Sequence, residues 1–193
     1  MARTKVFDEE QILQKALQLF WCKGYEATSM QDLVEGLGIN RSSLYDTFGD
    51  KKSLFLQALK LYRDRQAKAL IDYLDSSPAE KASLAQLLHN VANEVIQDAD
   101  RKGCFMVNST LELVNRDKDV EEIVVENNLL VEKAFREFLI RLQQNGQLSP
   151  QQNPADLARF LLSAISGLKV SAVARPDAQF LQSVVQSILQ VIG

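Results

Sequence analysis

Apolar residues recur three and four positions apart along almost all of the 193 residues, and this helical spacing constrains the fold more than any other feature. No stretch shows the sustained alternation of apolar and polar residues that a half-buried strand would need. Only four prolines and eight glycines interrupt the pattern. We therefore predict an all-α fold.

Capping and turn residues divide this pattern into about nine helices. The first three begin near Asp8, Thr28 and Asn40, whose side chains can accept hydrogen bonds from first-turn amides. A longer fourth helix begins at Asp50 and reaches about Leu74. The remaining helices are expected at about 79–98, 103–115, 118–145, 154–174 and 178–192.

Composition excludes several classes of protein. With 46% hydrophobic and 24% charged residues, the chain has the balance of a folded globular protein. No uncharged apolar run of about 18 residues and no signal peptide are visible, which favours a cytoplasmic location. One histidine and two cysteines provide neither a di-iron nor a zinc site, and no phosphate-binding glycine loop is present. We expect no enzyme, metal or cofactor.

Two short helices joined by Leu37-Gly38-Ile39 form a predicted helix-turn-helix, a motif whose second helix enters the DNA major groove. Arginine can pair with guanine, serine suits several base edges, and a tyrosine hydroxyl suits a phosphate. The net charge is −3, and residues 1–52 carry seven basic against eight acidic side chains. DNA binding must therefore depend on where the charges lie. The outward positions of the second helix are Arg41, Ser42, Ser43, Tyr45 and Asp46.

The stretch from about Phe7 to Leu59 resembles the DNA-binding domain of the tetracycline-repressor-like (TetR/AcrR) transcription regulators. The resemblance implies a homodimeric repressor that binds a double-stranded DNA operator and a small-molecule effector. It divides the chain into a helix-turn-helix domain, 1–55, and a helical effector-binding and dimerisation domain, 56–193. Thr47 and Asp46 depart from the family pattern and affect the expected operator preference. The matching residues are Ala16–Phe20, Gly24–Ser29, Leu33–Ser43, Leu44–Phe48, Asp50–Lys52 and Leu54-Phe55.

Carried over by position, the resemblance implies three kinds of DNA contact. Thr28 and Ser29 would contact the DNA backbone at the start of the second helix. Arg41, Ser42 and Ser43 would read bases. Tyr45 and Lys51 would contact phosphates, and Lys51 would do so at a helix N-terminus that itself favours anions.

The larger half offers weaker signals. Its last two helices are apolar nearly all round, which predicts a four-helix dimer interface, with the core of a monomer as the alternative. The predicted interface residues are Leu157, Leu161, Ala164, Leu168, Leu181, Val184, Val185 and Ile188. Polar groups that interrupt apolar faces suggest an effector pocket, although His89 also suits the surface. The candidates are Tyr62, His89, Asn93, Phe105, Ser109, Glu112 and Asn127.

A ligand that shifts the fourth helix would change the separation of the two DNA-reading helices, so we expect the effector to release DNA. Two other interpretations stay open. One is a helical adaptor that has lost DNA binding, which the acidic first domain and Asp46 would suit. The other is a thiol-based redox sensor that uses Cys104, although Cys22 and Cys104 both also suit core positions.

Overall fold

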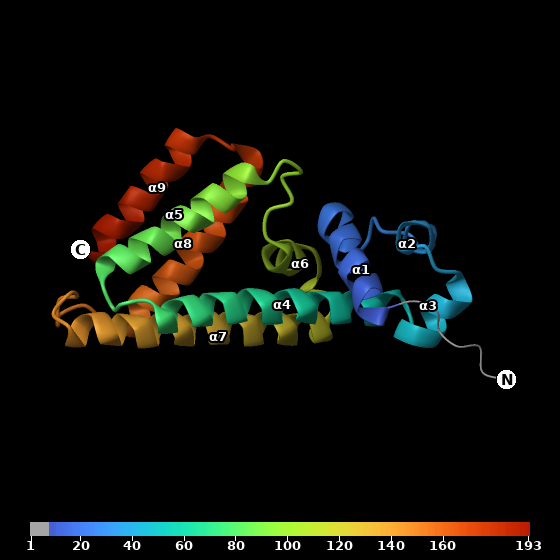
Figure 1. Ribbon diagram of the computed structural model, residues 1–193, viewed down its shortest axis with the longest axis horizontal. Coiled ribbons are helices and arrows are strands. Elements are labelled where there is room, and N and C mark those ends of the chain that lie inside the picture. Colours follow the sequence, from blue (N-terminus) through green and yellow to red (C-terminus); the bar gives the residue numbers. More distant parts are fainter. Residues whose placement is uncertain (1–7) are drawn as a thin grey trace.

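The computed structural model describes residues 8–193, and every regular element in that range is an α-helix (Figure 1). The all-α prediction is therefore confirmed. The described helices are α1 (Glu9–Lys23), α2 (Met30–Leu37), α3 (Arg41–Phe48), α4 (Lys51–Ser76), α5 (Lys81–Gln97), α6 (Phe105–Leu113), α7 (Lys118–Gln144), α8 (Pro154–Ala174) and α9 (Ala178–Ile192).

The helices α1 to α3 and the first turns of α4 form a small unit at one end of the molecule, which we call the head (Figure 1). Local capping positions these helices. Asp8, Asn40 and Asp50 each accept a first-turn backbone N–H, as predicted. Ser29 caps α2 and forms a reciprocal capping box with Asp32.

The rest of the chain, which we call the body, is built on two long helices. The helices α4 and α7 lie side by side, with α5, α8 and α9 packed at their far end and α6 near the head (Figure 1). Arg63 Nη1 lies 2.6 Å from Glu126 Oε2, and Arg141 Nη2 donates to the Leu74 carbonyl at 2.6 Å. Both contacts join α4 to α7, so a displacement of one long helix involves the other.

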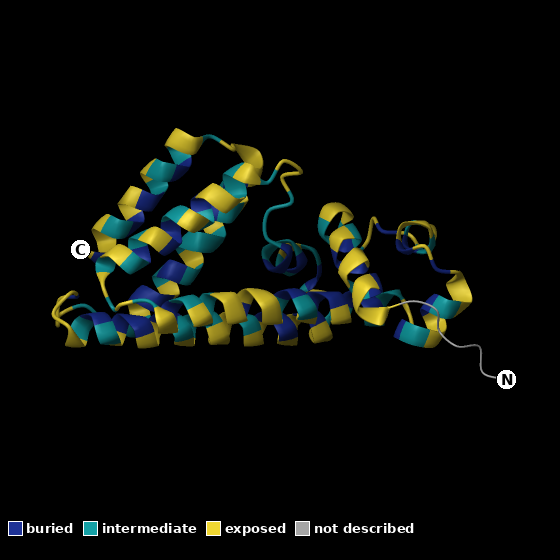
Figure 2. Ribbon diagram, in the orientation of Figure 1, coloured by how far each residue is buried: buried dark blue, intermediate teal, exposed yellow. Residues whose placement is uncertain are grey.

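Two hydrophobic cores result, and dark blue residues mark their inward faces in Figure 2. The first lies beneath the head but continues into the body. Phe20 of α1, Phe55 of α4 and Phe105 of α6 meet edge to face, with centroids 5.2 and 5.6 Å apart. The expected domain boundary at residue 55 falls inside α4, so head and body share a helix and part of a core.

Helix α8 is long and apolar enough, by length and composition, to cross a membrane. It packs instead against α5, α7 and α9, with Leu161 and Leu168 buried among them. Even so, only 22% of its most apolar stretch is buried within the single chain. One face of α8 is thus both apolar and uncovered.

Candidate nucleic-acid interface and effector cavity

The turn before α3 fixes where the candidate recognition helix begins. Gly38 has φ +70° and ψ 27°, a left-handed conformation that glycine adopts without steric cost. Ile39 packs into the head core, and the Asn40 side chain accepts the Ser43 N–H at 2.8 Å. Helix α3 therefore starts at Arg41 with a defined orientation.

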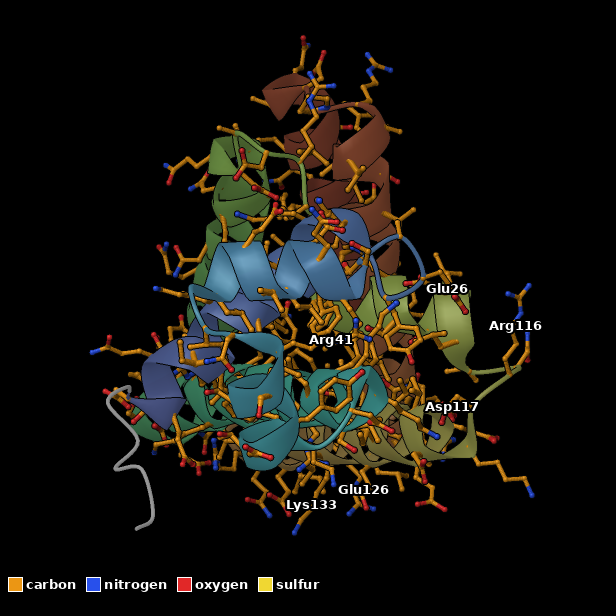
Figure 3. All side chains as sticks on the ribbon, turned by 90° about the vertical axis from the view of Figure 1, so that its right-hand side faces the viewer. Glu26, Arg41, Arg116, Asp117, Glu126 and Lys133 are labelled. Atoms are coloured by element: carbon orange, nitrogen blue, oxygen red, sulfur yellow. The ribbon has the colours of Figure 1, made fainter. Side chains whose placement is uncertain are left out.

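Leu44 and Phe48 anchor α3 in the core, which leaves its other face in solvent. Arg41, Ser42 and Tyr45 are exposed, and Ser43 is half-buried. Figure 3 looks at the head end on and shows Arg41 on the near face of the molecule. The predicted base-reading residues therefore lie on an accessible surface.

Two pairs of side chains cross this surface one helical turn apart. Arg41 Nη2 donates to the Tyr45 hydroxyl at 3.4 Å, and its guanidinium lies 5.7 Å from the centre of the tyrosine ring. Ser42 Oγ donates to Asp46 Oδ2 at 3.4 Å. Asp46 thus accepts a hydrogen bond from the Ser42 hydroxyl. Arg41 is the one cationic side chain of α3.

The structure places Thr28 differently from the sequence prediction. Its side chain is completely buried, and its hydroxyl donates to the Gly24 carbonyl at 2.6 Å. Thr28 therefore closes the α1–α2 turn and is not accessible to DNA. Ser29 is exposed but already donates to Asp32 Oδ2 at 2.6 Å, within the capping box.

The two lysines that begin α4 differ in their surroundings. Lys51 Nζ lies 4.3 Å above the Tyr25 ring and stays half-buried at the helix N-terminus. Lys52 Nζ lies 2.9 Å from Asp117 and 2.6 Å from Asp119, both at the start of α7. The Asp119 and Asp117 carboxylates accept hydrogen bonds from the Lys52 ammonium and raise the pKa of Lys52 above its usual range. Lys52 thus attaches the head to the body, and Lys51 remains the candidate phosphate contact.

Two further contacts join the head to the body at the two ends of α6. The Trp21 indole N–H donates to the Gly103 carbonyl at 3.2 Å. In the last turn of α6, the Glu112 carboxylate accepts the N–H groups of Tyr25, at 3.1 Å, and Glu26, at 2.8 Å. Gly24 makes room for it, because a Cβ there would lie 3.1 Å from Glu112 Oε2. In Figure 3, Glu26 of the head and Asp117 of the body lie on the same side of the molecule.

The main cavity of the described chain has a volume of about 450 Å³ and lies within the body. Its walls come from one face each of α4, α5, α6, α7 and α8. Most of the lining is apolar, which is typical of small-molecule sites. The lining includes Tyr62, Leu70, Tyr73, Leu87, Glu94, Cys104, Thr110, Val131, Phe135, Leu162, Ser166 and Lys169.

Of the seven predicted effector residues, the structure brings Tyr62 and Asn127 to this cavity. Burial, and then the neighbouring Cys104 thiol, raise the pKa of Tyr62, whose hydroxyl donates to Cys104 Sγ at 3.5 Å. The residues Phe105, Ser109 and Glu112 surround a smaller hollow against α1. His89 and Asn93 do not line the main cavity.

Sequence reasoning missed two charged lining residues, Glu94 and Lys169. A signal for Glu94 exists in the sequence, because Leu87, Asn90, Val91 and Glu94 recur at helical spacing and line one wall. Which face of α5 meets the cavity cannot be read from that spacing. Within residues 8–193, no three His, Cys, Asp or Glu side chains gather as a metal site would require.

The predicted dimer residues also need correction. The side chains of six of the eight are buried in the second hydrophobic core of the same chain, so these six are not available to a partner. Six of them are buried and Ala164 and Val184 are half-buried, because α8 and α9 pack these faces against α5 and α7. The buried six are Leu157, Leu161, Leu168, Leu181, Val185 and Ile188.

A capped helix-turn-helix with an exposed arginine, joined to a helical body with an internal cavity, defines a DNA-binding regulator with a separate sensing domain. Residues 12–58 match the family described as "Bacterial regulatory proteins, tetR family", and residues 81–188 match "Tetracyclin repressor-like, C-terminal domain". The chain therefore belongs to the TetR family of transcriptional regulators.

Individual relatives agree with this assignment. The chain is 32% identical over 193 residues to the uncharacterized HTH-type transcriptional regulator YezE of Bacillus subtilis, and 100% of each chain is covered. It is 34% identical over 171 residues to the HTH-type transcriptional repressor ComR of Escherichia coli, covering 88% of this chain and 81% of that one. A solved structure of a cysteine mutant of the TetR family regulator CifR, complexed with 26-bp double-strand operator DNA, superposes with a TM-score of 0.88. That chain is 29% identical and is covered completely, as is this one.

Proposed function

We propose that this protein represses transcription from the cytoplasm as a homodimer on a pseudo-palindromic operator, and that a small molecule in the main cavity releases it. The observation that carries this proposal is the exposed face of α3, where Arg41, Ser42 and Tyr45 lie on a helix anchored by Leu44 and Phe48. The repressor ComR and the operator complex of CifR support the same function.

The uncovered face of α8 supports the dimer. Ser163, Gly167, Val170 and Ala174 recur along one face of α8, and all four are exposed in the single chain. A Cβ at Gly167 would meet nothing within 4 Å, so a partner helix can approach closely there. We place the four-helix interface on this outward face, not on the buried leucines predicted from the sequence.

The contacts at the head suggest how the cavity controls DNA binding. Helix α6 lines the cavity with Thr110, while Glu112 on the same helix holds the α1–α2 turn. Helix α4 lines it with Tyr62 and, through Lys52 at its N-terminus, is tied to α7. A ligand that moves α4 or α6 moves the heads away from the spacing of about 34–36 Å that successive major grooves require. Such coupling is typically about 1–3 kcal/mol.

Neither alternative interpretation is favoured. An adaptor that has lost DNA binding would not need an open, arginine-bearing face on α3. The similarity to the repressor ComR and to the operator complex of CifR does not favour a thiol-based redox sensor that uses Cys104 either. Cys104 is half-buried, its thiol accepts the Tyr62 hydroxyl, and Cys22 is exposed.

Selection of operators from randomised DNA, followed by gel-shift titration, tests the proposal. We expect Arg41→Ala to weaken specific binding by about tenfold or more, in line with about 1–3 kcal/mol for a base contact. Arg136→Ala is the matched control, because Arg136 is an exposed arginine on α7. Failure to enrich any sequence, or equal affinity of both variants for the selected operator, would overturn the proposal.

A further inference from the structure

The main cavity is polarised along its length. Helices α5 and α8 both run toward the head end of the body (Figure 1), so Leu87 and Leu162 lie at the far end while Glu94 and Lys169 lie at the near end. A smaller hollow of about 170 Å³ against Trp21 is lined by Tyr62, Glu94 and Lys169 as well, which places these groups beside the head. Apolar side chains such as the buried Phe135 also line the cavity.

The polar groups of the lining are mostly occupied within the chain. The hydroxyls of Tyr73, Thr110 and Ser166 each donate to a backbone carbonyl, at 2.8 Å in every case. Lys169 and Glu94, in contrast, have no ion-pair partner among the described residues. A ligand can therefore gain most binding free energy from hydrogen bonds to these two unpaired charged side chains at the near end.

The two charged side chains differ in exposure, and this difference decides the sign of the charge that a ligand should carry. Glu94 is exposed, so water and salt screen its charge, whereas Lys169 is half-buried beside apolar walls. An ammonium that is partly removed from water gains more from a counter-ion than an exposed carboxylate does. A ligand with an acidic group would thus be held at Lys169 with its apolar part toward Leu70, Val131 and Phe135.

From this geometry we infer that the effector is a small, largely apolar molecule with one carboxylate, which pairs with Lys169. The inference rests on the proposed effector-controlled function and names the ligand class of that site. A volume of about 450 Å³ lies within the range of small-molecule sites.

Calorimetric titration with octanoate, octan-1-ol and octylamine, without DNA, tests the charge directly. Wild type should bind octanoate at least about tenfold more tightly than octan-1-ol, the size of one charge-assisted hydrogen bond. Lys169→Met should abolish this preference and Lys169→Arg should keep it. Glu94→Gln should leave it unchanged or increase it. Lys133→Met, an exposed lysine on α7, controls for loss of a positive charge elsewhere.

Three results would overturn the inference: no preference for octanoate in wild type, tightest binding of octylamine, or an undiminished preference in folded Lys169→Met. Thermal unfolding of each variant shows whether it folds. If Lys169→Met does not fold, the preference for octanoate is compared between wild type and Lys169→Arg. The proposed repression is measured separately by operator binding. If the protein binds its operator but does not prefer octanoate, only the inferred ligand class is wrong. If it prefers octanoate but binds no operator, only the proposed repression is wrong.

Discussion

The side chain of Glu112 attaches α6 to the head, and a single substitution at this residue tests that attachment. Its carboxylate accepts two backbone N–H groups, from Tyr25 and Glu26, across the head–body junction. A hydrogen bond to a charged group contributes about 1.5–3 kcal/mol. Because Glu112 is half-buried and water competes for it, we expect about 2 kcal/mol for both bonds together. Glu112→Ala should raise the equilibrium constant for opening of this turn about 30-fold, at 1.4 kcal/mol per factor of ten.

Amide hydrogen exchange measured by NMR reports on the two donors themselves. In Glu112→Ala, the amides of Tyr25 and Glu26 should exchange about 30-fold faster than in wild type. Glu112→Gln should give an intermediate rate, because it keeps an acceptor oxygen but loses the charge. Glu122→Ala, which removes an exposed carboxylate from α7, should change neither amide.

Operator affinity is the second measurement on the same variants. Glu112→Ala should bind the operator more weakly than Glu122→Ala, because a head that is free of α6 must be ordered again on the DNA. If the amides of Tyr25 and Glu26 exchange at the wild-type rate in a folded Glu112→Ala protein, the carboxylate does not hold the turn. The proposed route from α6 to the head would then be wrong.

Three further predictions concern salt, assembly and acid. A dimer that makes about 6–10 phosphate contacts should lose roughly a thousandfold or more in operator affinity between 50 and 200 mM salt, and a flat titration would contradict the docking of α3. Gly167→Arg should convert the dimer into a folded monomer in analytical ultracentrifugation, whereas Ala99→Arg, on an exposed loop residue, should not; a dimeric Gly167→Arg would move the interface elsewhere. The hydrogen bond from Lys23 holds the pKa of Asp32 below its usual range, so its stabilisation is present at neutral pH and is lost as pH falls below about 4. The melting temperature should therefore decrease in acid, and Asp32→Asn should reduce that decrease.

The sequence predicted the helices well because the signals that end them are local. Asn40 reaches an amide three residues away, and Gly38 needs only its own backbone conformation. The same sequence did not reveal which side of α8 faces inward, because leucines at helical spacing look alike on a core face and an interface. Leu161 proved to be completely buried, while Gly167 lies in the open. The direction depends on how α5 and α7 pack against α8.

The junction between head and body was equally invisible in the sequence. Glu112 meets its partners across 86 and 87 residues of chain, and no local pattern marks a carboxylate that will accept distant backbone amides. Its polarity alone suggests a place in the effector pocket. Thr28 is a case in which the local sequence allows two roles. A threonine before a helix can contact DNA from an exposed position, or it can donate a buried hydrogen bond, as Thr28 does to the Gly24 carbonyl. Only the tertiary structure separates these uses.

These contacts also bear on how an acidic domain can bind a polyanion. Lys23 pairs with Asp32 and Lys52 pairs with Asp117 and Asp119, so much of the positive charge near the reading surface serves the protein's own junctions. Arg41 and Lys51 have no carboxylate partner among the described residues. Affinity must then come from these two cations, from the free amides at the start of α4, and from presenting the set twice in a dimer. Two weakly charged heads bind tightly only when both engage together, and a repressor of this kind is for that reason sensitive to small changes in the distance between them.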